Sequence, residues 1–154
     1  MREYTRTSRA CTLKDLHPGL RSAILEYTAS HSLAGIDDSH ICCETTSIKV
    51  KRGLFGGRAE TLVSAALCTP AWLVWAFWKD GRDQGVRSAR LRDIQVTDYE
   101  GSQNYQLIED TGLVIDGIDP VDGQSGSVFI GLGIESAALS FRARLGEMVL
   151  IARG

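Results

Sequence analysis

Residues 60–80 read ETLVSAALCTPAWLVWAFWKD, and this stretch decides the fold. From Leu62 to Trp78 it carries no charged residue, and it contains all three tryptophans of the chain. Thr69-Pro70 interrupts the apolar run near its middle, where the fixed φ of proline favours a tight turn. A membrane-spanning helix needs about 20 predominantly apolar residues. We therefore expect two adjacent, buried β-strands joined at Pro70.

The two expected strands have no polar face. Side chains alternate between the two sides of a strand, yet apolar residues occupy both sides of 62–68 and of 71–78. An antiparallel sheet with one side in water shows polar residues at alternate positions. Both sides of this hairpin must therefore be covered. We expect a helix before the hairpin to cover the second side, with a partner subunit or a ligand as the alternative.

Composition sets limits on the class of protein. The chain has 154 residues, of which 44% are apolar and 23% charged, and this is typical of one globular domain. Its net charge of −2 argues against a nucleic-acid binder, which has a basic excess. The N-terminus lacks the apolar segment of a secretory signal. We expect a soluble, cytoplasmic protein that is not transmembrane.

The four cysteines, Cys11, Cys42, Cys43 and Cys68, show no CxxC spacing. In a chain of this size we interpret them as buried thiols in a reducing cytosol rather than as a disulfide framework.

The segment before the hairpin is predicted to hold one helix. Residues 1 to about 12 are polar, and we expect them to be frayed. Pro18 suits the first turn of a helix, and apolar residues follow at helical spacing up to about Ser30. From His40 onward, short runs separated by turn residues predict antiparallel strands. These expected strands cover 40–51, the two hairpin strands, 86–91, 94–99, 105–109, 113–115 and 127–132.

The chain ends in a different period. Apolar residues recur three and four positions apart, as on one face of an amphipathic helix of about four turns. These residues are Ile134, Ala138, Phe141, Leu145, Met148 and Val149. We expect this helix to cover an open end or edge of the sheet.

About seven strands followed by one closing helix resemble pleckstrin-homology-like domains. Two stretches carry the likeness: SAALCTPAWLVWAFW at 64–78 resembles the second and third strands of bacterial members, and VRSARLRDIQVTDYE at 86–100 the fourth and fifth. The resemblance covers roughly residues 40–150. It implies an α+β fold, a barrel or sandwich of about seven antiparallel strands closed by the C-terminal helix. Residues 1–38 would then form a helical appendage and 39–154 the domain.

The resemblance also implies a binding or scaffold role and no catalysis. We expect a non-enzymatic interaction module that acts through self-association or a protein partner. The alternative is binding of an anionic lipid or small ligand through Lys49, Lys51, Arg52 and Arg58. Glu60 stands where a basic residue would complete the usual phosphoinositide-binding pattern, and a solvated turn also explains this loop.

One cluster combines residue types that bind metals: His31, His40, Cys42 and Cys43. Adjacent residues of a strand point to opposite faces, so Cys42 and Cys43 do not easily bind one tetrahedral ion. We expect no metal site and no cofactor.

Two short motifs resemble catalytic or nucleotide-binding signatures. Asp110-Thr111-Gly112 resembles the triplet of dimeric aspartic peptidases, but Leu113 follows where those sites have a small residue. Gly131-Leu132-Gly133 supplies two glycines of a dinucleotide-binding fingerprint without a βαβ unit around it. All three histidines lie in the N-terminal quarter, which leaves no Ser-His-Asp set. We interpret both motifs as connections between elements and predict no enzyme activity.

Overall fold

The computed structural model describes residues 2–38, 41–49, 59–79, 83–118 and 126–154. These residues form eight β-strands, two α-helices and several short 3-10 helices. The strands are β1 (Tyr4–Ala10), β2 (Ile41–Lys49), β3 (Glu60–Cys68), β4 (Trp72–Lys79), β5 (Asp83–Arg90), β6 (Gln95–Asp98), β7 (Gly112–Ile118) and β8 (Gly126–Gly131). The α-helices are α1 (Pro18–Ser30) and α2 (Ser136–Arg153). The 3-10 helices are η1 (Leu13–Asp15), η2 (Ile36–Asp38), η3 (Leu91–Asp93), η4 (Tyr99–Gly101) and η5 (Gln103–Gln106).

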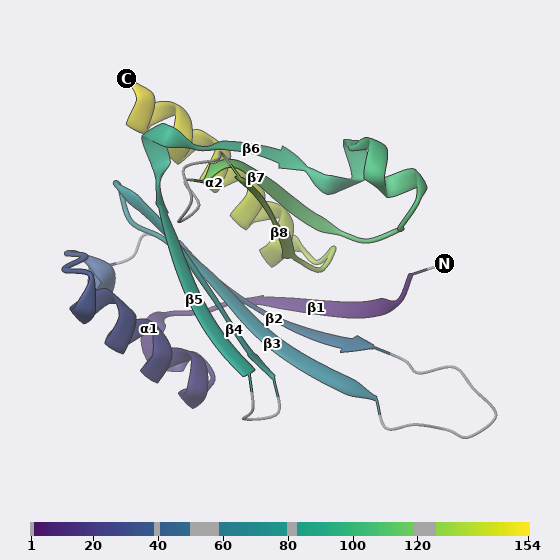
Figure 1. Cartoon of the computed structure of the whole chain (residues 1–154), viewed down its shortest axis with the longest axis horizontal. Coiled ribbons are helices and arrows are strands. Elements are labelled where there is room, and N and C mark those ends of the chain that lie inside the picture. Colours follow the sequence, from purple (N-terminus) through teal and green to yellow (C-terminus); the bar gives the residue numbers. More distant parts are fainter. Residues whose placement is uncertain (1, 39–40, 50–58, 80–82, 119–125) are drawn as a thin grey trace.

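In the described part of the chain, the strands form two antiparallel sheets. The first sheet has the order β1-β2-β3-β4-β5 and the second the order β6-β7-β8. Figure 1 shows α1 on one side of the first sheet, and α2 with the second sheet on the other. The α+β class is therefore confirmed. Within the described ranges the two sheets do not join into a closed barrel.

The predicted hairpin is confirmed as β3 and β4 at the centre of the first sheet. Ala66 pairs with Trp75 and Cys68 with Leu73. At the turn, the Thr69 hydroxyl accepts hydrogen bonds from the backbone amides of Ala71 at 3.3 Å and Trp72 at 3.0 Å. The threonine thus satisfies the backbone donors that the Pro70 turn leaves free.

The inner face of the hairpin, which points toward the second sheet and α2, lies in the main core. Ala66, Cys68, Leu73 and Trp75 pack there against both sheets and α2. The other members of this inner cluster are Ile41, Cys43, Leu91, Ile94, Leu113, Ile115, Ile118, Ile130, Leu132, Ala138, Phe141, Leu145 and Val149.

The outer face of the hairpin is covered by the N-terminal segment, as expected. Leu20 and Ile24 of α1 are fully buried against this face. The complete outer cluster is Leu13, Leu16, Leu20, Ile24, Ile36, Cys42, Ala65, Leu67, Val74 and Ala76. The predicted bounds of this helix, Pro18 to Ser30, agree with α1.

The expectation that residues 1–12 are frayed is wrong. They contain β1, which pairs with β2 from Tyr4↔Lys49 to Ala10↔Cys43. An edge strand needs a partner on one side only, and β1 carries polar residues that make no apolar pattern. Ser8 of β1 is buried: it is 5% exposed, and its hydroxyl lies 2.7 Å from that of Thr45. The chain on both sides of residue 38 therefore contributes to one sheet.

A second correction concerns the expected strand at 105–109. This segment contains the last two residues of η5, followed by an exposed part in which Leu107 is 84% and Ile108 61% exposed. The Tyr99 hydroxyl donates to the carbonyl oxygen of Ile108 at 2.6 Å and closes the loop on itself. Apolar residues alone therefore do not make a strand here, because the segment folds into a short loop held by its own hydrogen bonds.

The closing helix is confirmed as α2. Ala138, Phe141, Leu145 and Val149 are buried, as the apolar stripe predicts. Ile134 is not part of it, because it precedes the helix and is 64% exposed. None of the helices in the described ranges is long and apolar enough to cross a membrane.

Candidate functional site

Of the four basic residues predicted to bind a ligand, one lies in the described part of the chain. Lys49 ends β2, where its Nζ lies 3.7 Å from a Glu3 carboxylate oxygen and 5.7 Å from the centre of the Tyr4 ring. Lys51, Arg52 and Arg58 lie outside the described residues, as does His40.

The potential metal ligands lie on different sides of the first sheet. Cys43 belongs to the inner cluster and Cys42 to the outer one, as the alternation of strand residues predicts. His31 stacks on Tyr27 with ring centres 3.9 Å apart. Among the described residues, no three His, Cys, Asp or Glu side chains come together in a way that could hold a metal.

The Asp110-Thr111-Gly112 triplet leads into β7, whose first residue is Gly112, and it connects the second sheet to β1 at the edge of the first. The Asp110 carboxylate accepts from Arg6 of β1 at both oxygens, at 2.8 and 2.7 Å. Both side chains are largely buried, at 8% and 14% exposed. Thr111 donates to the Leu132 carbonyl oxygen at 2.6 Å. Asp110 is therefore the partner of Arg6 in a structural ion pair.

The outward side of α2 carries a second apolar surface. Leu139, Ala143, Gly146 and Leu150 follow one another at helical spacing and form what we call the α2 stripe. Leu139 is 54% and Leu150 69% exposed. A hollow of about 350 Å³ runs beside the stripe, between α2 and β6. Gly146 lies open, since a Cβ added there meets nothing within 4 Å.

Arg142 fixes one flank of the stripe. Its guanidinium donates to both carboxylate oxygens of Glu100 at 3.0 Å, and to Asp98 at 3.2 Å. Burial alone would raise the pKa of Glu100, but the hydrogen bonds and charge of Arg142 hold it below its usual value. The bidentate contact keeps the arginine in one geometry.

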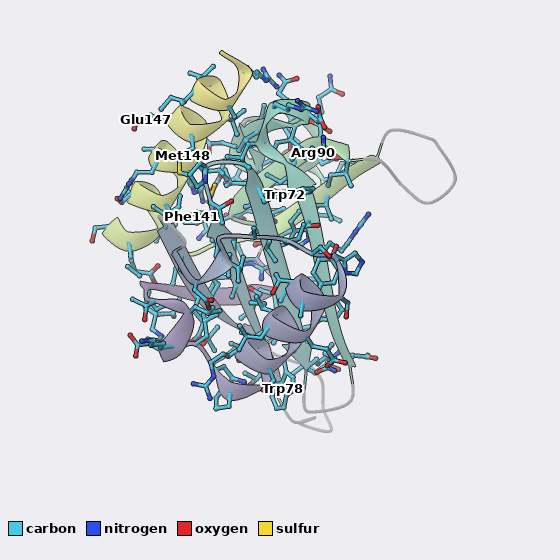
Figure 2. All side chains as sticks on the ribbon, turned by 90° about the vertical axis from the view of Figure 1, so that its left-hand side faces the viewer. Trp72, Trp78, Arg90, Phe141, Glu147 and Met148 are labelled. Carbon is cyan, nitrogen blue, oxygen red and sulfur yellow. The ribbon has the colours of Figure 1, made fainter. Side chains whose placement is uncertain are left out.

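A second surface lies at the C-terminal end of α2, beside the hairpin turn. Figure 2 shows Met148 on α2 and, on the neighbouring sheet end, Trp72 near Arg90. The Arg90 guanidinium lies 5.4 Å from the Trp72 ring centre. Hollows of about 330 and 300 Å³ meet at Pro70, and Ile151 at the second of them is 78% exposed. Tryptophan, arginine and methionine are enriched at protein interfaces.

A third feature is a cleft of about 310 Å³ between the two sheets. Trp75 and Phe77 of β4 line it on one side and Phe129 of β8 on the other. Arg87 of β5 enters it, with its guanidinium 5.9 Å from the Trp75 ring centre. Among the described residues, Arg87 has no carboxylate within ion-pair distance.

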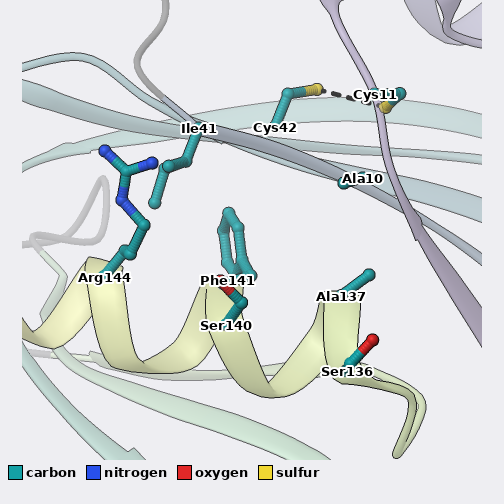
Figure 3. Close-up of a pocket in the computed structure, with 9 residues that line it drawn as sticks. All are labelled: Ala10, Cys11, Ile41, Cys42, Ser136, Ala137, Ser140, Phe141 and Arg144. Atoms are coloured by element: carbon teal, nitrogen blue, oxygen red, sulfur yellow. Dashed lines mark hydrogen bonds between the residues drawn. The ribbon is translucent and has the colours of Figure 1, made fainter.

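A fourth feature is a hollow of about 520 Å³ between the first half of α2 and the ends of β1 and β2. Figure 3 shows Ser136, Ser140, Phe141 and Arg144 along its floor on α2. Cys11 and Cys42 stand at its opposite wall. Their two sulfurs lie 3.5 Å apart, on the side of β2 away from α2.

Two of these features were missed by reasoning from the sequence. The α2 stripe had a readable signal, because Leu139 and Leu150 are large apolar residues that lie outside the core-facing stripe of the helix. The Cys11–Cys42 contact had none, because it depends on the pairing of β1 with β2.

Comparisons with protein-family models, with curated proteins and with solved structures give no match to this chain.

Proposed function

We propose that this chain is a non-enzymatic, pleckstrin-homology-like interaction module of the cytoplasm that self-associates through the α2 stripe. The observation that carries the proposal is the pair of exposed leucines on α2, 54% and 69% exposed, with small residues between them. Folding of one chain leaves this apolar surface in water, and such surfaces mark sites of association.

The order of the elements supports the pleckstrin-homology-like part of the proposal. Four strands, β2 to β5, are followed by three, β6 to β8, and then by the closing helix α2. β1 and α1 are additions in front of this set. Domains of this layout bind partners and carry no catalytic groups, and the pairing of Asp110 with Arg6 favours the same conclusion.

The arrangement of the stripe favours a second copy as the partner. Leu139, Ala143, Gly146 and Leu150 are four, three and four residues apart, so the stripe is the same read in either direction. In an antiparallel pair of α2 helices, Leu139 meets Leu150 of the second copy and Ala143 meets its Gly146. A two-fold dimer requires such a self-complementary patch.

The presence of a glycine in the middle of α2, at Gly146, supports a close contact between helices at the stripe. Glycine inside a helix costs about 1 kcal/mol relative to alanine. Among the described residues, no neighbour requires its small size, because the space beside it is open. Close approach of a second helix does require it, since small residues reduce the distance between helix axes.

The test uses the intact chain and Gly146→Gln. Glutamine fits the open space, favours the helix and separates two helices in contact. We expect its dimer to dissociate at least tenfold more readily in sedimentation equilibrium. Ser22→Gln, at an exposed position of α1, is the matched control and leaves association unchanged. An unchanged dissociation constant for Gly146→Gln contradicts the proposal.

A second candidate function is binding of a small anionic ligand with an apolar part, or of an anionic lipid. Arg87 in the aromatic cleft favours it, because its charge is uncompensated among the described residues. The test is titration with anilinonaphthalene sulfonate, an anionic aromatic probe. Saturable binding that weakens with salt and is lost in Arg87→Gln, but not in Arg21→Gln, supports this function. Equal binding by both variants excludes the cleft.

A further inference from the structure

Cys11 and Cys42 meet although 31 residues separate them in sequence. The pairing of Ala10 with Cys43 places Cys11 opposite Cys42 at the next position of the ladder. The Cys11 amide donates to the Cys42 carbonyl oxygen at 3.2 Å, and the sulfurs are 3.5 Å apart. Directly opposite residues of an antiparallel pair have Cα atoms about 5.5 Å apart, within the range that a disulfide spans.

The two thiols differ in their surroundings. Cys42 is 7% exposed inside the outer cluster, whereas Cys11 is half-buried at the sheet edge. The hydrogen bond from Cys42 and the charge of Arg9 lower the pKa of Cys11. The same contact and burial raise the pKa of Cys42. Cys11 is therefore the more accessible and more readily ionised thiol, and Cys42 is the buried thiol in contact with it.

We propose that Cys11 and Cys42 form a thiol–disulfide exchange site, in which Cys11 reacts with a low-molecular-weight disulfide and Cys42 resolves the product into an intramolecular disulfide. This inference does not depend on the proposed self-association.

The exchange is balanced in two steps. The Cys11 thiolate attacks one sulfur of the small disulfide, whose other half leaves as a thiolate and takes up the proton that Cys11 lost. The Cys42 thiol then loses its proton and attacks Cys11 Sγ, and the second half leaves as a thiol. The chain loses two electrons and two protons, and the small disulfide becomes two thiols. The sulfurs close from 3.5 Å to about 2.0 Å.

The other two cysteines serve as internal controls. Burial raises the pKa of Cys43 to about 11 and that of Cys68 to about 12. Cys43 neighbours Cys42 in sequence but points into the inner cluster. Cys68 is fully buried, and its thiol donates to the Thr69 carbonyl oxygen at 3.3 Å. Neither faces the Cys11–Cys42 contact.

The experiment exposes the intact folded chain to oxidised glutathione at several ratios to reduced glutathione. Mass spectrometry of the whole protein and of peptides from a non-reducing digest follows the products. We expect the monomer to lose two hydrogen atoms, with the peptides of Cys11 and Cys42 linked. Cys42→Ser is expected to stop at a mixed disulfide of glutathione on Cys11. Cys11→Ser is expected to react at least tenfold more slowly, and Cys68→Ser to behave as the unmodified chain.

Three results contradict the proposal. The first is an unmodified chain that keeps four free thiols at the most oxidising ratio while its fold, followed by circular dichroism, is unchanged. The second is oxidation that links Cys43 or Cys68, or that joins two chains. A Cys42→Ser variant without the mixed disulfide on Cys11 equally rejects the order of the two steps.

Discussion

The helices α1 and α2 cover opposite faces of the first sheet. They differ in how much apolar surface they leave exposed on their outward sides. Leu20 and Ile24 of α1 are fully buried, and its outward side holds one large apolar residue, Leu25, at 40% exposed. In α2, Leu145 is equally buried, yet the outward side exposes Leu139 and Leu150 further, at 54% and 69%. The difference separates a helix that completes a core from a helix that also leaves an apolar surface exposed, which we propose is a site of self-association.

The largest expected effect comes from removing the N-terminal cover. Deletion of residues 1–35 takes away β1 and α1, and thereby exposes Leu67 and Val74, both fully buried in the intact chain. We expect the truncated protein to aggregate or to change its oligomeric state, as light scattering would detect. A truncated protein that does not aggregate and keeps the oligomeric state of the intact chain would show that α1 is not needed to cover the hairpin.

Alanine substitutions measure the inward and outward sides of each helix. Ile24→Ala and Leu145→Ala are expected to lower the free energy of unfolding by about 2–5 kcal/mol, because each leaves a cavity. Leu25→Ala and Leu139→Ala, on the outward sides, are expected to cost less than about 1 kcal/mol. Urea unfolding at low protein concentration gives these values. Of the four, Leu139→Ala alone is expected to weaken association as well.

Alanine substitutions of the glycines in α1 and α2 are expected to have smaller effects on stability, of opposite sign. Gly146→Ala adds a methyl group to open space and is expected to stabilise the monomer by about 1 kcal/mol. Gly19→Ala in α1 places its Cβ 2.8 Å from the Trp78 ring, so we expect no such gain and a net loss. Thermal unfolding of both variants checks the signs. A gain at Gly19 would mean that α1 fits the hairpin loosely.

The smallest expected effect is a pH dependence at the flank of α2. Because Arg142 holds the pKa of Glu100 below its usual value, ionised Glu100 stabilises the folded state above its unfolded pKa of about 4.3. This contribution is lost as pH falls through the lower, folded pKa. Glu100→Gln lacks it, so the stabilities of the two proteins should converge below about pH 4. A constant difference between them down to pH 2 would argue against the Arg142 contact.

The parts of the fold that apolar periodicity encodes were predictable from the sequence. The uncharged run 62–78 indicated the hairpin, and the spacing of Leu145 with its neighbours indicated α2. The side of the hairpin covered by α1 followed from the absence of a polar face. β1 was not predictable this way, because an edge strand of polar residues is held by backbone hydrogen bonds to β2 rather than by burial.

The candidate sites could likewise be predicted where they follow from local sequence and not where they depend on strand pairing. The contact of Cys11 with Cys42 arises from the pairing of β1 with β2, so it could not be predicted while residues 1–12 were expected to be frayed. Pairing of Asp110 with Arg6 is equally a product of β1. The α2 stripe needed no long-range contact, and its palindromic spacing was visible in the sequence. The predicted role of Lys51, Arg52 and Arg58 stays a prediction.

The mass of the unmodified chain in solution tests the central claim most directly. Sedimentation equilibrium over a wide range of protein concentration is the measurement, with thiols kept reduced so that no disulfide contributes. Self-association through α2 predicts a concentration-dependent rise from 16.8 kDa to twice that mass, with no larger species. A mass that stays at 16.8 kDa up to the highest concentration would contradict it.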